Sequence, residues 1–145
     1  MISQTAEYAL RAVVHLARFG DAGQTTRQIA DATSVPMAYL SKVVQSLVRA
    51  GIVASRRGIG GGCVLVRPPG ALTIFEIIEA VEPIQRIRCC PLGLEEHREE
   101  LCPLHQRLDD AMAYVEASFK ATTVDEILNT PGKRSALCSR GEGTP

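Results

Sequence analysis

The chain has 145 residues, 46% of them hydrophobic, and its 16 Lys and Arg offset 16 Asp and Glu. This length and composition predict one folded domain with at most a small appendage, and they argue against a disordered chain. The sequence contains no apolar run of the ~20 residues that a membrane span requires and no secretory signal, so we expect a cytoplasmic protein without a membrane partner. In that reducing compartment, five Cys favour thiol or metal chemistry over a disulfide framework.

The charge is distributed unevenly between the two halves of the chain. Residues 1–70 carry eight basic and three acidic side chains, a balance of +5, whereas residues 71–145 carry eight basic and thirteen acidic ones, a balance of −5. Such an asymmetry predicts that only the N-terminal half contacts a polyanion, with chance scatter of small counts as the alternative.

The first 50 residues predict three helices with tight connections. Residues 2–19 repeat apolar side chains at helical spacing, and residues 25–28 (TTRQ) form a capping box that opens a second helix. Pro36 occupies a favoured first helical position, and the third helix ends before Gly51. Three helices of this size and connection length are typical of a helix-turn-helix unit.

Two β-prone runs follow at residues 52–54 and 63–66, separated by the glycine-rich segment 55–62. A strand, a glycine-rich turn and a second strand predict a β-hairpin, which would be a wing directly after a helix-turn-helix. Because the turn is so rich in glycine, we expect little but backbone to project from its tip. A nucleotide-phosphate loop is the rival interpretation, but no helix follows Gly62 to hold a phosphate.

The C-terminal half begins with a second capping box at residues 73–76, which opens a helix to about Val81. A loop is expected over residues 84–102, and Thr123 is expected to cap a last short helix. Between them, apolar residues recur in steps of 4, 4, 3 and 4, close to a coiled-coil seam. A stripe this long on a small domain predicts a dimer interface, with intrachain core as the alternative. The predicted dimerisation residues are Leu104, Leu108, Met112, Val115 and Phe119.

These elements predict a mainly α fold with a small β-hairpin, organised in three parts. Residues 1–70 form a winged helix-turn-helix DNA-binding domain, and residues 71–130 hold a sensor loop and the dimerisation helices, the longer of which lies near the C-terminus. Residues 131–145, rich in Gly, Ser and charge, are expected to be a disordered tail.

The predicted DNA interface combines the third helix with the wing. The side chains opposite the apolar stripe of the helix are small or can hydrogen-bond, which suits a major groove, although a plain solvated face has the same composition. A thin basic hairpin suits a minor groove, where negative potential attracts Arg. The candidate DNA-binding residues are Ala38, Tyr39, Ser41, Lys42 and Gln45 on the helix, and Arg56, Arg57, Gly58, Gly60 and Gly61 in the wing.

Four segments together resemble the Rrf2 family of bacterial winged helix-turn-helix transcription regulators. They are residues 7–11 (EYALR), 39–42 (YLSK), 47–53 (LVRAGIV) and 57–62 (RGIGGG), and the likeness covers roughly residues 1–128. The resemblance implies a homodimer joined by the helix at about 104–120, with the third helix in the major groove. It also implies that Arg57 reaches the minor groove. Such a dimer would bind a pseudo-palindromic operator in double-stranded DNA.

The resemblance further implies a sensor of iron, redox state or nitric oxide. Family members of that kind hold an iron–sulfur cluster on three Cys spaced C-x5-C-x5-C, and here Cys90 and Cys102 match the outer two. Glu96 stands at the middle position, so one thiolate is missing. His105 matches a His of one branch of the family, and Glu7 matches an acidic ligand that the partner subunit can supply.

The chemistry of these side chains leaves three outcomes open. Thiolates with imidazoles suit zinc or an iron–sulfur cluster, and His can replace Cys at one iron, which favours a two-iron, two-sulfide cluster. Zinc and no metal at all, as in clusterless relatives, are the alternatives. The candidate ligands are Cys90, Cys102, His105 and Glu7, with Cys89 and His97 as possible substitutes.

An enzyme and a protein-interaction module are the alternatives to a DNA-binding protein. An enzyme is not expected, because no nucleophile–base pair or carboxylate dyad occurs at a recognisable spacing. A winged helix can also serve as a protein-interaction module. Such a module has no need for Arg56 and Arg57, so the basic wing favours DNA.

Overall fold

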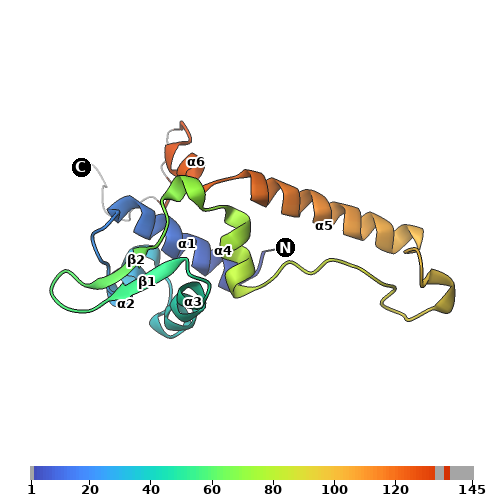
Figure 1. The fold of residues 1–145 in the computed structure, drawn as a ribbon, viewed down its shortest axis with the longest axis horizontal. Helices are drawn as coiled ribbons and strands as arrows, with labels where there is room; N and C mark the ends of the chain where they lie inside the picture. The colour runs from blue at the N-terminus through green and yellow to red at the C-terminus, as the bar shows by residue number, and fades with distance from the viewer. Residues whose placement is uncertain (1, 133–135, 138–145) are drawn as a thin grey trace, which may run out of the picture.

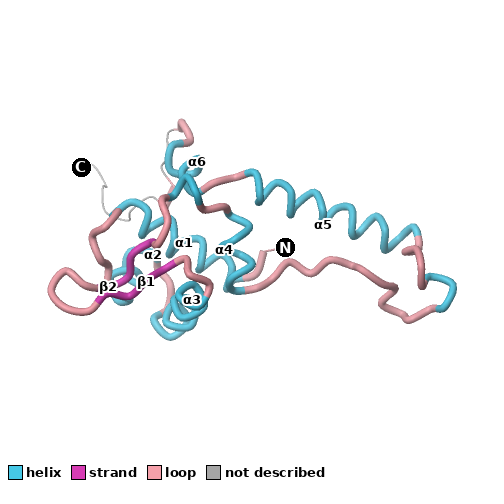
Figure 2. Tube along the Cα trace, viewed as in Figure 1, coloured by secondary structure: helices cyan, strands magenta, loops and turns pink. Residues whose placement is uncertain are grey.

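The computed structural model describes residues 2–132, 136 and 137 of the chain. These residues form a mainly helical fold with one two-stranded hairpin and a long helix near the C-terminus, which confirms the predicted fold class (Figures 1 and 2). The elements in chain order are α1 (Gln4–Phe19), α2 (Thr26–Thr33), α3 (Met37–Arg49), β1 (Val53–Arg56), β2 (Gly62–Leu65), the 3-10 turn η1 (Pro69–Ala71), α4 (Ile74–Val81), the 3-10 turn η2 (Glu95–His97), α5 (Pro103–Ala121) and α6 (Val124–Asn129).

Three helices begin at capping boxes. At the start of α2, α4 and α6, a Thr hydroxyl accepts the backbone N–H three residues on, and the Gln or Glu there accepts the N–H of the Thr in return. These reciprocal bonds satisfy donors that an isolated helix end leaves unpaired, which is why the pattern predicted each start. Pro36 is the residue before α3 and keeps an extended ψ of 133°, so α3 begins one residue later than predicted.

The core of the molecule surrounds α1. Ala9, Ala12 and Val13 of this helix are completely buried, and α2, α3, α4, α6 and β2 all contact it. Leu47 of α3 and Ile77 of α4 are also completely buried in the same cluster. We call the unit formed by α1–α4, α6 and the hairpin the head of the molecule.

The hairpin is anchored to the loop before α2. β1 and β2 pair antiparallel, with Arg56 opposite Gly62, so Arg56 lies in a strand and not in the turn. The backbones of Gln24 and Cys63 exchange two hydrogen bonds of 3.0 and 2.7 Å. Gly23 is required here, because a Cβ would lie 2.6 Å from the carbonyl oxygen of Gly61. Cys63 is buried, as a small apolar residue would be, and burial raises the pKa of its thiol.

After α4, the loop over residues 83–102 leads away from the head, and helix α5 returns beside it from the far tip to the head (Figures 1 and 2). Asp109 is the buried residue of α5, whereas Leu104 and Leu108 are 64% and 48% exposed. The C-terminal half of the helix lies against the head, where Phe119 contacts the cluster that contains Ile78. None of the helices in the described part of the chain combines the length and apolarity of a membrane span.

Most of the predicted tail, namely residues 133–135 and 138–145, lies outside the described residues. Ala136 and Leu137 pack against the core, and Arg18 donates a hydrogen bond of 2.8 Å to the carbonyl oxygen of Leu137.

Candidate DNA interface and sensor loop

Helix α3 has one buried face and one exposed face, as its sequence predicts. Leu40, Val43, Val44 and Leu47 lie in the core, while Ala38, Tyr39, Lys42 and Gln45 are exposed. Ser41 is half-buried and donates its hydroxyl to the carbonyl oxygen of Met37 at 3.0 Å, so its oxygen remains available as an acceptor.

Tyr39 stands at the edge of this face beside α1. Its ring centroid lies 6.3 Å from that of Tyr8, and the two rings, with Lys42, line a shallow hollow between the start of α1 and α3. The exposed face of α3 therefore continues into a polar and aromatic edge supplied by α1.

The basic residues of the predicted interface are not neutralised within the described part of the chain. Arg11, Arg67 and Arg86 form ion pairs with acidic side chains, but Lys42, Arg56 and Arg57 form none there. A charge without a counter-charge is free to bind an external anion, and in a helix-turn-helix with a wing the phosphates of a nucleic acid are such an anion.

The expectation that only backbone projects from the wing tip is wrong. Ile59, between Gly58 and Gly60, is fully exposed, more than any other large hydrophobic residue that the structure describes. The two glycines adopt positive φ angles of 96° and 73°, which turn the chain sharply and leave the intervening side chain pointing outward. The sequence contained the signal for this, an isoleucine between two glycines, but the prediction considered only the glycines.

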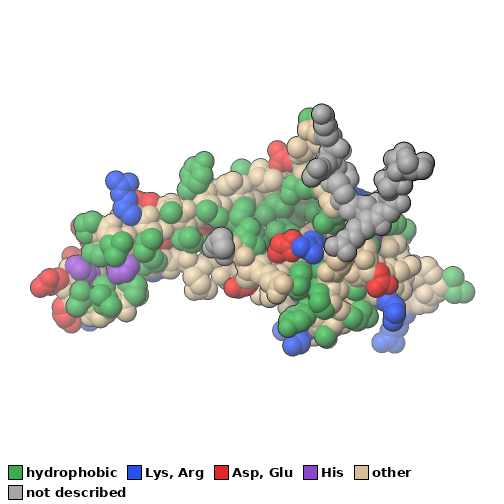
Figure 3. Space-filling model, turned by 180° about the vertical axis from the view of Figure 1, so that it is seen from behind, with side chains coloured by type: hydrophobic (Ala, Val, Ile, Leu, Met, Phe, Trp, Pro, Cys, Tyr) green, Lys and Arg blue, Asp and Glu red, His purple; other side chains and the backbone are tan. Residues whose placement is uncertain are grey.

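The loop over residues 83–102 and the start of α5, the candidate sensor region, bring the candidate ligands together as two Cys–His pairs. Cys90 Sγ lies 3.7 Å from His97 Nδ1, and Cys102 Sγ lies 3.3 Å from His105 Nδ1. On the face in Figure 3, histidine side chains gather at the far tip of the molecule, where the loop meets the start of α5. Cys89, one of the two possible substitute ligands, is exposed.

Cys90 lies in surroundings that favour its thiolate. The backbone N–H of Leu94 is the main cause, and together with His97 and the N–H of Leu92 it lowers the pKa of this thiol to about 7. A thiolate is the form of Cys that ligates a metal.

Each Cys–His pair has the donor types and spacing of two metal ligands, although the predicted four ligands do not meet in the described chain. In a tetrahedral zinc site a bound sulfur and a bound nitrogen lie roughly 3.5–3.6 Å apart, close to the spacing within each Cys–His pair. In the described residues, no three His, Cys, Asp or Glu side chains converge on one point. Glu7 instead accepts a 2.7 Å hydrogen bond from Arg11 on its own helix.

An ion-pair cluster that sequence reasoning missed ties the start of this loop to α5. The Arg86 guanidinium donates two hydrogen bonds of 2.7 Å to the carboxylate of Asp109 and one of 3.2 Å to Glu116. The backbone N–H of Ile87 also donates to Asp109, at 2.9 Å. Asp109 and Glu116 are seven residues apart, two turns along one face of α5, and that spacing is the signal that could have pointed to a shared partner.

The cluster fixes the charge state of its members. The hydrogen bonds from Arg86 are the main cause that lowers the pKa of Asp109 to about 2, and the same bonds raise the pKa of Arg86. Bidentate bonding of this kind fixes both position and orientation. We call Arg86, Asp109 and Glu116 the α5 clamp.

The fold and the exposed basic residues define the class of protein. A compact three-helix unit, with its third helix exposed on one face and a two-stranded wing after it, is a winged helix-turn-helix, a class of DNA-binding fold.

Residues 2–130 match the Rrf2 family, described as an iron-dependent transcriptional regulator, and the chain belongs to this family. A protein of Aquifex aeolicus named as an HTH-type transcriptional regulator is 29% identical over 143 residues, which are 97% of this chain and 99% of the relative. Among solved structures, CymR, the global cysteine regulator of B. subtilis, is 28% identical, with a TM-score of 0.73 over 87% of this chain and 94% of that one. IscR of T. potens has the same fold, with a TM-score of 0.72 and 22% identity over 88% of this chain and 85% of that one.

We expect Asp109→Asn to loosen the start of the sensor loop, because a neutral amide cannot hold the Arg86 guanidinium as a carboxylate does. Amide hydrogen exchange should become faster over residues 84–88, and the melting temperature should fall. The Asp109 pKa is about 2 in the folded chain and roughly 3.9 when unfolded, so its stabilisation is complete above pH ~4 and is lost as the pH falls through 2. The difference between wild type and variant should therefore shrink in acid.

Asp110→Asn is the matched control, since the exposed Asp110 accepts only from Gln106 on its own helix. Equal losses of protection in the two variants would contradict a specific role for the clamp.

Proposed function

We propose that the protein binds a pseudo-palindromic site in double-stranded DNA as a homodimer in the cytoplasm, and so regulates transcription. The observation that carries this proposal is the set of exposed basic side chains, Lys42, Arg56 and Arg57, that have no acidic partner in the described part of the chain. They lie on the two elements, α3 and the wing, that a winged helix-turn-helix directs toward DNA.

In this proposal α3 enters the major groove and the wing enters the adjacent minor groove. Ala38 allows close approach, while Ser41, Lys42 and Gln45 supply groups that hydrogen-bond base edges or phosphates. Tyr39, at the edge toward α1, is placed to reach the backbone. In the wing, Arg56 and Arg57 would follow the negative potential of the minor groove, with the backbone of Gly58, Gly60 and Gly61 close to the DNA.

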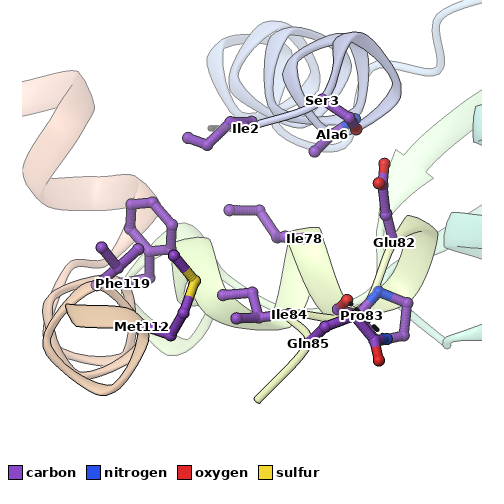
Figure 4. A pocket seen from close by; sticks show the side chains of 11 residues that line it. Ile2, Ser3, Ala6, Ile78, Glu82, Pro83, Ile84, Gln85, Met112 and Phe119 are labelled. Carbon is purple, nitrogen blue, oxygen red and sulfur yellow. Dashed lines mark hydrogen bonds between the residues drawn. The ribbon is translucent and has the colours of Figure 1, made fainter. Parts of the chain in front are cut away.

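The dimer is proposed from the surface of α5. An apolar groove of about 400 Å³ lies between the start of α1, α4 and α5, lined among others by Ile2, Ile78, Ile84, Met112 and Phe119 (Figure 4). Leu104 and Leu108 continue the same stripe of α5 toward its exposed tip. A helix of this length with one buried residue has little to stabilise it within its own subunit, and a second copy of α5 along Leu104, Leu108, Met112, Val115 and Phe119 would cover the stripe.

The sensor is proposed at the two Cys–His pairs. Cys90, Cys102 and His105 would hold a two-iron, two-sulfide cluster or a zinc ion, and the contact between Cys90 and His97 favours His97 as the fourth ligand over the partner subunit's Glu7. When bound, a cluster would respond to iron supply, oxidation or nitric oxide. The part played by this chain is to present two thiols and two imidazoles on the loop and on the first turn of α5, the proposed dimer helix, to which the α5 clamp joins the start of the loop.

DNA binding is tested on duplexes selected from a random pool, with affinity measured by fluorescence anisotropy at several salt concentrations. Arg57→Ala should weaken specific binding by roughly 1–3 kcal/mol, the usual worth of a base contact. Lys42→Ala should weaken all sequences alike and lower the salt slope by about one, as expected for a phosphate contact. Arg98→Ala, which removes the same charge from the distant sensor loop, is the control and should bind normally. Failure to bind any duplex in a salt-dependent way would favour a protein-interaction module instead.

Met112→Asp should convert the dimer into a monomer or unfold it, because the symmetric interface cannot hydrate a buried carboxylate. Light scattering measures the mass and circular dichroism the fold. Ala117→Asp places the same charge on an exposed position of α5 away from the stripe and should leave the dimer intact. A folded, dimeric Met112→Asp protein would place the interface elsewhere.

The sensor is tested on protein purified without oxygen, by absorbance and by analysis for iron, sulfide and zinc. Cys102→Ala should abolish visible absorbance and metal content, because it removes the thiolate that begins the Cys-x-x-His pair at the start of α5. Cys89→Ala should leave both unchanged.

If His97→Ala lowers metal content and Glu7→Ala does not, His97 is the fourth ligand. Zinc without sulfide would identify a zinc site, and wild-type protein free of metal after reconstitution would identify a clusterless regulator.

A further inference from the structure

The tip of the wing carries an apolar side chain that no contact in the described chain explains. Ile59 is fully exposed, whereas the next most exposed large hydrophobic residues, Tyr114 and Leu92, retain 79% and 73% of their surface. No other side chain of the turn from Gly58 to Gly61 projects, because the remaining residues are glycines. An apolar side chain that is fully exposed to water does not stabilise its own subunit. We therefore expect Ile59 to contact the surface of a binding partner.

The wing holds this side chain in a defined place. The N–H of Gly61 donates a 3.0 Å hydrogen bond to the carbonyl oxygen of Gly58, which closes the turn around Ile59. A Cβ on Gly61 would lie 2.5 Å from the carbonyl oxygen of Arg56, and the loop at Gly23 packs on the other side of the turn. The turn is therefore compact, and it is tied through Gln24 to the base of the helix-turn-helix.

The surroundings of Ile59 are cationic. Arg56 and Arg57 precede it in the hairpin, both exposed and without an acidic partner among the described residues. Figure 1 shows the wing at the opposite end of the molecule from the tip of α5, so neither the sensor loop nor the proposed dimer stripe covers it. A narrow tip that combines two cations with one apolar side chain suits the minor groove, where cations are attracted by the negative potential and apolar side chains contact sugars or wedge between base steps.

We propose that Ile59 enters the minor groove beside Arg57 and wedges against a base step, which bends the operator and selects for a flexible pyrimidine–purine step such as TA. The proposal rests on the proposed function, because it requires that the wing meets duplex DNA. The wedge adds specificity that charge and hydrogen bonding do not supply, because the free energy needed to unstack two neighbouring base pairs depends on which bases they are.

The test compares wild type, Ile59→Ala and Arg57→Ala on one selected duplex that contains a TA step at the wing position and on the same duplex with that step changed to AA. Affinity is measured across salt concentrations, and bending is measured by energy transfer between dyes at the duplex ends. Ile59→Ala should bind the TA duplex about tenfold more weakly, because the variant loses most of the hydrophobic free energy gained by burying an isoleucine side chain. It should also bend the DNA less and lose the preference for TA over AA.

The salt slope separates the two residues. Ile59→Ala should keep the wild-type slope, because it removes no charge, whereas Arg57→Ala should lower it. Val66→Ala, an exposed apolar residue just after β2, is the matched control and should bind and bend like wild type. Because Ile59 contacts nothing in the core, both alanine variants should melt as wild type does.

Wild-type affinity, bend and step preference in Ile59→Ala, with Arg57→Ala still weakened, would overturn the proposal for Ile59 and leave the proposed function standing. Wild-type protein that binds no duplex in a salt-dependent way would overturn both.

Discussion

The arrangement of the head depends on the burial of α1. This helix contributes Ala9, Ala12 and Val13 to the core without any exposed surface, and small side chains at its centre let α3 and α4 pack closely against it. β2 and α6 contact it as well. Because α3 and β2 both pack on α1, and α3 also contacts β1, the relative orientation of α3 and the wing is set by packing in the core.

Helix α5 obeys a different constraint. Most of its residues are exposed within one subunit, and its contacts to the rest of the chain include one at Phe119 near one end and one at Asp109 in the middle. The first contact is apolar and joins α5 to the head, while the second is ionic and joins it to the loop through Arg86. Helix α5 is therefore the element that connects the loop to the head.

The candidate sites follow the same division. The candidate DNA-binding residues lie on well-anchored elements, since α3 has a fully buried face and the wing is held by Gly23 and Gln24. Cys90 and His97 lie on a loop whose regular structure in the described chain is a single 3-10 turn, and Cys102 and His105 lie where that loop meets α5. In the described residues these side chains contact one another in pairs. The two candidate sites therefore lie on different kinds of structure, one on packed helix and hairpin and the other largely on a loop.

The sequence alone determined features that depend on residues close together in the chain. The three capping boxes, the buried stripe of α3, the wing and the length of α5 were all predictable, because hydrogen bonds over three residues and a 3.6-residue period act locally. The tertiary structure decided the rest. The bond between Arg86 and Asp109 joins positions 23 residues apart, and the pairing of Cys90 with His97 requires the loop to fold back on itself. The exposure of Ile59 also depends on the tertiary structure, since Gly23 and Gly61 pack backbone to backbone and the one side chain left over must point outward.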